Sequence, residues 1–208
     1  MPSLFIISAP SGCGKTSLVE ALIKRNDNLC VSVSHTTRKP RAEENNEINY
    51  YFISLEEFEK MIVDNAFVEY AKVFDNYYGT AIESIKHQIS KGKSVILEID
   101  WQGAYQVKKK FPNAVSIFIL PPSKEDLKRR LQQRAQDDQS IINKRMANAK
   151  NEMLHYKNYG YLVINEDFDT ALSDLEIIIC RSDNDSERSR LSITEQSIKH
   201  KKLLKKLI

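Results

Sequence analysis

Short apolar runs alternate with segments of helical period along most of this chain. The runs are rich in β-branched residues, which favour strands that are buried on both faces. Helical segments between successive strands are typical of the crossovers that join parallel strands. The pattern therefore predicts an α/β fold with a parallel central sheet, whose strands are expected at residues 4–8, 30–34, 94–100, 115–120 and 161–165.

The pattern changes between residues 33 and 74. Apolar and polar residues alternate over residues 48–53, a short helical segment follows, and residues 67–74 again have the pattern of a strand. A pair of strands around a short helix does not fit the regular alternation of the rest of the chain. We therefore expect a small inserted subdomain here.

Local signals mark the ends of two helices. Ser54 with Glu57, and Thr80 with Glu83, have the spacing of a capping box, in which hydroxyl and carboxylate satisfy amides at a helix start. Gly92 stands where the second of these helices should end. Both helices are expected to begin directly after the capping hydroxyl.

Length and charge narrow the class of protein. A chain of 208 residues and 24.0 kDa fits one globular domain with small inserted subdomains. A net charge of +3 gives no general attraction for nucleic acid. The most basic cluster is the tail, residues 200–208. It is compatible with an RNA or membrane contact, although we favour a solvated helical face beside an apolar stripe.

Cysteine content and the first residues indicate a cytoplasmic protein. The three cysteines, Cys13, Cys30 and Cys180, cannot all pair with one another, and their spacing matches no metal site. The first apolar run has no basic leader and is too short for a signal peptide or a membrane span. We expect no disulfides and no membrane partner.

The strongest local motif is Ala9-Pro10-Ser11-Gly12-Cys13-Gly14-Lys15-Thr16 between the first strand and the first helix. Such a loop wraps backbone amides around phosphate oxygens, while Lys15 adds a cation and Thr16 a hydroxyl ligand for Mg²⁺. A glycine-rich turn that only joins strand to helix is the alternative, but the order of elements favours nucleotide binding. Cys13 is expected to be exposed, with a pKa lowered by the neighbouring Lys15.

A second anion site is suggested by Ser34-His35-Thr36-Thr37-Arg38-Lys39-Pro40-Arg41 and the following Asn49-Tyr50-Tyr51-Phe52. Guanidinium forks suit a phosphate monoester, and tyrosine hydroxyls can complete its shell. A basic loop is, however, usually solvated surface. This segment alone leaves both interpretations open.

Taken in order with four further segments, this region resembles guanylate kinase from about residue 3 to residue 180. The further segments are Phe67-Val68-Glu69-Tyr70-Ala71, Asn76-Tyr77-Tyr78-Gly79-Thr80, Leu97-Glu98-Ile99-Asp100-Trp101-Gln102-Gly103 and Val163-Ile164-Asn165-Glu166-Asp167. The resemblance implies a P-loop kinase with a parallel central sheet flanked by helices. It also implies a core of residues 1–33, 80–122 and 160–208, an inserted mixed β/α GMP-binding subdomain at 34–79 and a helical lid at 123–159.

The resemblance further implies transfer of the γ-phosphoryl group of ATP to GMP, and to dGMP, with Mg²⁺ at Thr16. Catalytic roles would fall to Lys15, Arg38, Arg134 and Arg145. The implied ATP contacts are Ala9, Pro10, Ser11, Gly12, Cys13, Gly14, Lys15, Thr16, Ser17, Arg130, Arg134 and Asn165. The implied GMP contacts are Ser34, Arg38, Arg41, Tyr50, Glu69, Tyr78, Thr80 and Asp100. Whether Glu98 or Asp100 reaches the metal through water stays open.

The chemistry of guanine agrees with this assignment of Glu69. Guanine presents two adjacent donors, N1–H and the 2-amino group, and an ionised carboxylate can accept from both. Adenine has an unprotonated N1 at that edge, so a buried carboxylate would lose its partners. A surface charge on a strand is the plainer alternative for Glu69.

Some positions depart from the family pattern. Ala42-Glu43-Glu44 stands where the family has Pro-Gly-Glu, and Ala135 and Gly160 depart from the pattern of the lid, in which a helix break is expected at residues 135–138.

The first rival function is that of a catalytically silent guanylate-kinase-like module that binds proteins, but such modules have a degraded phosphate loop. A kinase for another nucleotide and a nucleic-acid-binding ATPase are more remote, so we expect ATP and GMP as partners, no nucleic acid, and leave a homo-oligomer open.

Overall fold

The computed structural model describes residues 2–41, 44–73, 75–134, 139–180 and 185–208. The chain divides into two compact units, one made of Met1–Ile6 with Asn28–Val115 and the other of Ile7–Asp27 with Ser116–Ile208. We call them the first unit and the second unit. The predicted division into core, GMP-binding subdomain and lid follows other boundaries and stays a prediction.

The larger sheet has the strand order β2-β7-β1-β8-β9. Its strands are β1 (Leu4–Ser8), β2 (Leu29–Val31), β7 (Ser94–Glu98), β8 (Val115–Leu120) and β9 (Tyr161–Ile164). β2 pairs with β7 and β8 pairs with β9 in parallel, and the central strands are buried along almost their whole length. The predicted parallel central sheet is confirmed, with the second strand beginning at Leu29 and ending three residues earlier than expected.

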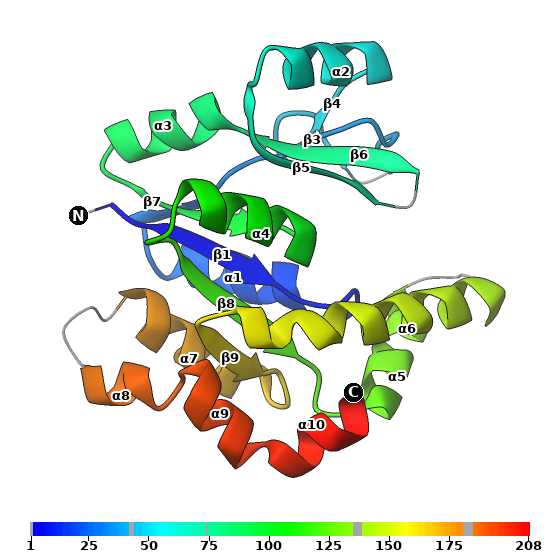
Figure 1. Ribbon diagram of the computed structural model, residues 1–208, viewed down its shortest axis with the longest axis vertical. Helices are drawn as coiled ribbons and strands as arrows, with labels where there is room; N and C mark the ends of the chain where they lie inside the picture. The colour runs from blue at the N-terminus through cyan, green and yellow to red at the C-terminus, as the bar shows by residue number, and fades with distance from the viewer. Residues whose placement is uncertain (1, 42–43, 74, 135–138, 181–184) are drawn as a thin grey trace. The chain divides into compact units, whose positions relative to one another are not determined.

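A second, four-stranded sheet belongs to the first unit (Figure 1). Its order is β4 (Tyr51–Phe52), β3 (His35–Thr36), β6 (Asn76–Ala81) and β5 (Phe67–Val73), and β5 runs antiparallel to β6. Helix α2 (Leu55–Val63) packs on this sheet through Phe58, whose ring stacks on those of Phe67 and Tyr77. The remaining helices of the unit are α3 (Ile82–Ser90) and α4 (Trp101–Lys110).

One of the two predicted capping boxes is confirmed and the other is wrong. Ser54 Oγ accepts from the Glu57 amide at 3.1 Å, and Glu57 Oε2 accepts from the Ser54 amide at 2.8 Å. Helix α3, in contrast, begins at Ile82 after Ala81, with no side-chain cap. Thr80 is a fully buried residue of β6, and its hydroxyl donates to Glu69 instead. Gly92 ends α3 as predicted, with a φ of 78°.

Helices make up most of the second unit, which also contains β9 and most of β8 (Figure 1). Its helices are α1 (Lys15–Lys24), α5 (Lys124–Arg134), α6 (Gln139–Met153), the 3₁₀ helix η1 (Leu154–Asn158), α7 (Phe168–Cys180), α8 (Asp185–Ser189), α9 (Ile193–Lys199) and α10 (Lys201–Leu207). Helices α1 and α7 pack together, and each buries aliphatic side chains, such as Leu22 of α1 and Leu175 of α7. The predicted helix break at residues 135–138 lies outside the described residues.

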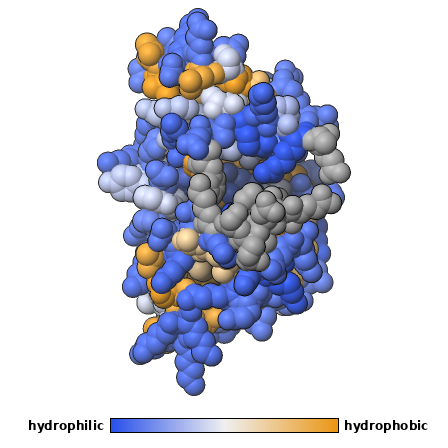
Figure 2. All heavy atoms as spheres, turned by 90° about the vertical axis from the view of Figure 1, so that its right-hand side faces the viewer, coloured by the Kyte–Doolittle hydropathy of each residue, from blue (hydrophilic) through white to orange (hydrophobic). Residues whose placement is uncertain are grey.

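The basic tail forms helices, as expected for a solvated face beside an apolar stripe. Leu204 and Leu207 of α10 are buried, while the lysines around them are exposed. Elsewhere the face seen in Figure 2 is mostly hydrophilic, with apolar side chains gathered at its top and again at its lower left edge. Leu55 and Val63, the first and last residues of α2, are exposed. In the part of the chain that the structure describes, no helix is both long and apolar enough to cross a membrane.

Candidate functional site

Residues 9–14 connect β1 to α1 in the second unit and form the loop predicted to hold phosphate. Gly12 and Gly14 have φ values of 87° and 84°, in the left-handed region that side-chain-bearing residues rarely adopt. The Cys13 amide donates to the Pro10 carbonyl at 3.1 Å and closes a turn. Gly14 caps α1 and offers no side-chain acceptor to the amides of the first turn, an arrangement that suits an anion.

The Cys13 side chain does not lie where the sequence suggested. It is 1% exposed, and burial raises the pKa of its thiol above the ordinary value. The expectation of an exposed, acidified thiol is therefore wrong. The reason is local, since the turn that presents the loop backbone places this side chain in the interior.

Asn165 connects the end of β9 to the phosphate loop. Its side-chain Nδ2 donates to the Cys13 carbonyl at 2.7 Å, and the residue is 4% exposed. A Cβ atom at Gly14 would stand 2.7 Å from the same Nδ2. Gly14 is thus required twice, by its backbone conformation and by the close approach of this amide. Sequence reasoning predicted Asn165 as an ATP contact, and the structure shows its amide bound to the loop.

Two further side chains of the second unit contact this loop or Asn165, which supports it. Arg130 of α5 donates to the backbone carbonyl of Asn165 at 3.0 Å and pairs with Asp126 at 2.8 Å. Glu152 of α6 accepts from the Ser11 amide at 3.3 Å. The charge of Arg130 therefore lies beside the residue that holds the loop.

The other residues predicted to contact ATP, and Arg145, which is predicted to be catalytic, lie on helices of the same unit. Lys15, Thr16 and Ser17 form the first turn of α1, and the last two are exposed. Arg145 is half-buried on α6. Arg134 is the last residue of α5, and its side chain lies outside the described part of the chain.

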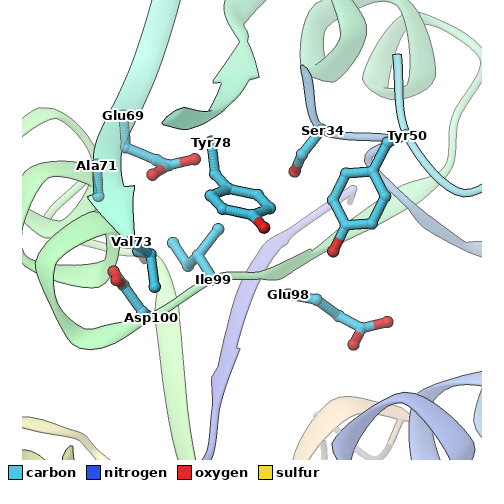
Figure 3. A pocket seen from close by; sticks show the side chains of 9 residues that line it. All are labelled: Ser34, Tyr50, Glu69, Ala71, Val73, Tyr78, Glu98, Ile99 and Asp100. Carbon is cyan, nitrogen blue, oxygen red and sulfur yellow. The ribbon is translucent and has the colours of Figure 1, made fainter. Parts of the chain in front are cut away.

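The first unit contains a pocket of about 160 Å³. Five predicted GMP contacts line it together with one face of β5 and the end of β7, and Figure 3 shows their side chains around the same space. The lining residues are Ser34, Tyr50, Glu69, Ala71, Val73, Tyr78, Glu98, Ile99 and Asp100. Carboxylates and hydroxyls thus surround a partly apolar wall, which suits a flat, polar-edged ligand.

Glu69 is the most deeply buried acid of this pocket, with 4% of its surface exposed. It lies on β5, and its Oε1 accepts from the Thr80 hydroxyl at 2.6 Å. The Thr80 hydroxyl lies 3.4 Å from that of Ser34. Thr80 itself is fully buried behind the lining and orients the acid.

Burial sets the protonation of Glu69. Loss of water raises its pKa to about 7, and the charge of Asp100 acts in the same direction. The hydrogen bond from Thr80 and the charge of Lys110 act in the opposite direction and only partly offset the effect of burial. A pKa of this kind is frequent at functional sites, because a buried acid without full compensation is ready for a ligand's donors.

The two arginines predicted to bind the GMP phosphate, Arg38 and Arg41, both contact the carboxylate of Glu44. Arg38 Nη2 contacts Glu44 Oε1 at 2.9 Å, and the Arg41 amide donates to Glu44 Oε2 at 2.8 Å. The hydrogen bond from Arg38 holds the pKa of Glu44 below its usual range. Arg38 is mostly buried, whereas the Arg41 side chain is 65% exposed.

Two tyrosines connect Arg38 to the pocket. The guanidinium carbon of Arg38 lies 5.5 Å from the centre of the Tyr50 ring, and the Tyr50 and Tyr78 rings meet edge to face at 5.9 Å. Their hydroxyls point toward the side of the pocket where Glu98 lies (Figure 3). Burial raises the pKa of Tyr50, so its hydroxyl stays protonated and able to donate.

Asp100 has a structural partner as well as a place in the pocket. Its Oδ1 accepts from the Gly103 amide at 2.9 Å and caps α4. Over the described residues, no group of three or more His, Cys, Asp or Glu side chains is arranged to hold a metal ion.

Sequence reasoning missed Glu44 and Glu152 as partners of the two segments predicted to bind anions. Glu44 was noticed only as part of a loop that departs from the family pattern, of which residues 42–43 lie outside the described residues. Glu152 is separated from Ser11 by 141 positions. Only the fold could reveal it.

Comparison with known proteins gives consistent matches over the whole chain. The family model for guanylate kinase matches residues 1–182. The chain is 49% identical over 206 residues to the guanylate kinase of Pseudoalteromonas translucida, covering 99% of this chain and 97% of the relative. It is 50% identical over 208 residues to that of Escherichia coli K12, with the same coverage. The crystal structure of guanylate kinase from Anaplasma phagocytophilum aligns with a TM-score of 0.71 and 29% identity, covering 98% of this chain and 96% of that one.

Proposed function

This chain belongs to the guanylate kinase family, and we propose how its residues transfer the γ-phosphoryl group of ATP to GMP. The family is one of P-loop enzymes, and nothing in the comparisons supports a catalytically silent protein-binding module. The observation that carries the proposal is the buried Glu69 in a pocket lined by Ser34, Tyr50, Tyr78 and Asp100.

ATP is proposed to bind at residues 9–17. The amides at the start of α1 suit the β- and γ-phosphates, and Lys15 would neutralise charge on the transferring group. Oxygen ligands suit Mg²⁺, and Thr16 places an exposed hydroxyl in this first turn. When bound there with ATP, Mg²⁺ supplies further neutralisation of phosphate charge.

The GMP phosphate is proposed to bind Arg38, Arg41, Tyr50 and Tyr78. The guanidinium of Arg38 already lies beside the Tyr50 ring, so cation and hydroxyl are grouped before the ligand arrives. GMP phosphate is itself an anionic nucleophile, so no strong general base is required. The protein's task is then to align two phosphates and stabilise the transition state.

Guanine is proposed to be read by Glu69, with Ser34, Thr80 and Asp100 around it. One oxygen of Glu69 accepts from Thr80, and each carboxylate oxygen has further lone pairs for the N1–H and 2-amino donors of guanine. These donors favour the ionised carboxylate, whose pKa is about 7 without them. Adenine lacks this donor pair, which gives the site its selectivity.

The lid is proposed to contribute Arg130, Arg134 and Arg145 during catalysis. Closure of such a segment excludes water and so prevents hydrolysis of ATP. Arg130 is held by Asp126 and the Asn165 carbonyl, close to the loop that Asn165 supports. We further propose dGMP as a second acceptor, because the contacts proposed above are to the base and the phosphate. We also propose the cytoplasm as the place of reaction, since the three cysteines are free, as is usual in a reducing compartment.

The direct test is an assay of ADP production with ATP and Mg²⁺, in which GMP, AMP, CMP and UMP are offered in parallel to the wild type and to Glu69→Ala. We expect rapid turnover with GMP alone, and loss of that preference in the variant. Binding of GMP without turnover would return support to the silent module. A preference for AMP or UMP would show that the acceptor pocket is wrongly assigned.

A further inference from the structure

Helix α4 presents one face to the strand that carries Glu69. Gly103, Gln106 and Lys110 are spaced i, i+3 and i+7, which places them in one row along the helix. All three approach β5, the edge strand of the four-stranded sheet. An edge strand leaves backbone donors and acceptors without a neighbouring strand, and here a helix face supplies partners.

Gln106 binds β5 much as another strand would. Its Nε2 donates to the Tyr70 carbonyl at 2.7 Å, and its Oε1 accepts from the Tyr70 amide at 3.2 Å. Lys110 Nζ donates to the Phe67 carbonyl at 3.1 Å. The backbone is therefore held on both sides of Glu69, which is two residues after Phe67 and one before Tyr70.

Gly103 provides the space that the Glu69 carboxylate occupies. A methyl group at this position would overlap Glu69 Oε2 and stand 3.1 Å from the carboxyl carbon. The other oxygen, Oε1, is already fixed by Thr80 at 2.6 Å. Glycine is a poor helix former, so its occurrence within the first turn of α4 is explained by this close approach.

We propose that Gly103 and Gln106 are specificity-determining positioning residues, which fix the Glu69 carboxylate so that it accepts both donors of guanine. The inference rests on the proposed function, in which Glu69 reads the base. Gly103 leaves room for the carboxylate at its observed position. Gln106 holds in place the backbone of β5, the strand from which the Glu69 side chain projects. Neither residue lines the pocket itself.

The test compares GMP with IMP, whose base lacks the 2-amino group but keeps N1–H, the ribose and the phosphate. A Glu69 carboxylate that accepts both donors of guanine distinguishes GMP from IMP. A carboxylate displaced by about 1 Å loses one of these hydrogen bonds and with it the distinction. In Gly103→Ala we expect kcat/KM for GMP to fall roughly 100-fold and the GMP:IMP ratio to fall about tenfold, with KM for ATP unchanged. In Gln106→Ala, where two hydrogen bonds are lost without a clash, we expect about a fivefold loss of the same ratio.

A double-mutant cycle shows whether Gly103 acts through Glu69. Glu69→Asp withdraws the carboxylate by one methylene, so a methyl group at position 103 then finds room. The loss caused by Gly103→Ala should be at least about fivefold smaller in the Glu69→Asp background. Gly160→Ala is the matched control, because the nearest atom to its new Cβ is at 3.5 Å, an ordinary contact.

The outcomes separate this inference from the proposed function. If the wild type does not phosphorylate GMP, the function itself is wrong. If the wild type prefers GMP to IMP and both variants keep that preference, only the inference is overturned. It is equally overturned if Gly103→Ala costs the same in both backgrounds. Should Gly103→Ala fail to fold by circular dichroism, the Gln106→Ala ratio decides the question alone.

Discussion

The proposed phosphate loop and the proposed guanine pocket are both suited to hold a ligand by polar groups, but they are built differently. The loop is one continuous stretch, residues 9–16, and its binding groups are mostly backbone amides set by two glycines. The pocket is assembled from side chains of segments that are up to 66 positions apart, from Ser34 to Asp100. One site depends on conformation, the other on which residues the fold brings together.

This difference determines how each site tolerates change. Most side chains of the loop can vary as long as the backbone keeps its shape, which is why Ala9 can replace a glycine at its start. In the pocket, acidic side chains have specific partners, as Glu69 has in Thr80 and Asp100 has in the Gly103 amide. Substitutions should therefore act sharply at a few loop positions and more evenly across the pocket.

The largest effect is expected at Lys15, the first residue of α1, whose charge is proposed to stabilise the transferring group. Lys15→Ala should lower kcat by about 10³-fold, since charge stabilisation in the transition state is lost. Equilibrium binding of GMP, measured by calorimetry, should change less than about twofold. Lys24→Ala, at the exposed end of the same helix, is the control. Equal losses in kcat and GMP binding would show that the two sites are not separate in their chemistry.

Asn165 tests whether the loop backbone needs outside support. Asn165→Ala removes the donor to the Cys13 carbonyl and should lower the free energy of unfolding by about 1–3 kcal/mol. We expect kcat/KM for ATP to fall about tenfold or more, while the preference for GMP over AMP stays. Denaturant unfolding and initial rates measure both effects, with the exposed Asn113→Ala as control. An unchanged kcat/KM for ATP would mean that the loop holds its shape unaided.

The sequence was informative where structure depends on neighbouring residues. The position of the loop between β1 and α1 and the Ser54 cap were predicted correctly, because both depend on residues within a few positions. Thr80 matched the same capping pattern, but the prediction was wrong, since a distant acid, Glu69, takes its hydroxyl. The contact of Gln106 with Tyr70 had no local signal at all. The pocket residues were named only through the resemblance to a family, which carries tertiary information that one sequence lacks.

The pH dependence of GMP binding tests whether the pocket, in contrast to the loop, depends on the ionisation of a single side chain, Glu69. The pKa of Glu69 is about 7 without ligand, and guanine's donors should lower it in the complex, because they favour the ionised form. Affinity is then fully present above the free pKa and is lost as pH falls through about 7. Between pH 8 and pH 6 this predicts roughly tenfold weaker binding, which calorimetry can measure.

The phosphate of GMP also titrates near pH 6, so a control is required. Glu69→Gln keeps the size of the side chain but cannot ionise. The ratio of wild-type to variant affinity removes the contribution of the phosphate and should itself fall about tenfold over this range. A ratio that does not vary with pH would show that Glu69 is ionised throughout or does not contact the base.

The smallest effect is expected at Glu44, which joins the two arginines without lining the pocket. Glu44→Gln weakens its contact with Arg38 and leaves the guanidinium less fixed beside Tyr50. We expect KM for GMP to rise about three- to tenfold with kcat nearly unchanged, as for the loss of one charged hydrogen bond. The exposed Glu56→Gln on α2 is the matched control. A lower KM in Glu44→Gln would reverse the interpretation, since the acid would then compete with the GMP phosphate for Arg38 rather than position it. Either sign shows that a side chain outside the pocket tunes it, as Asn165 supports the loop from outside.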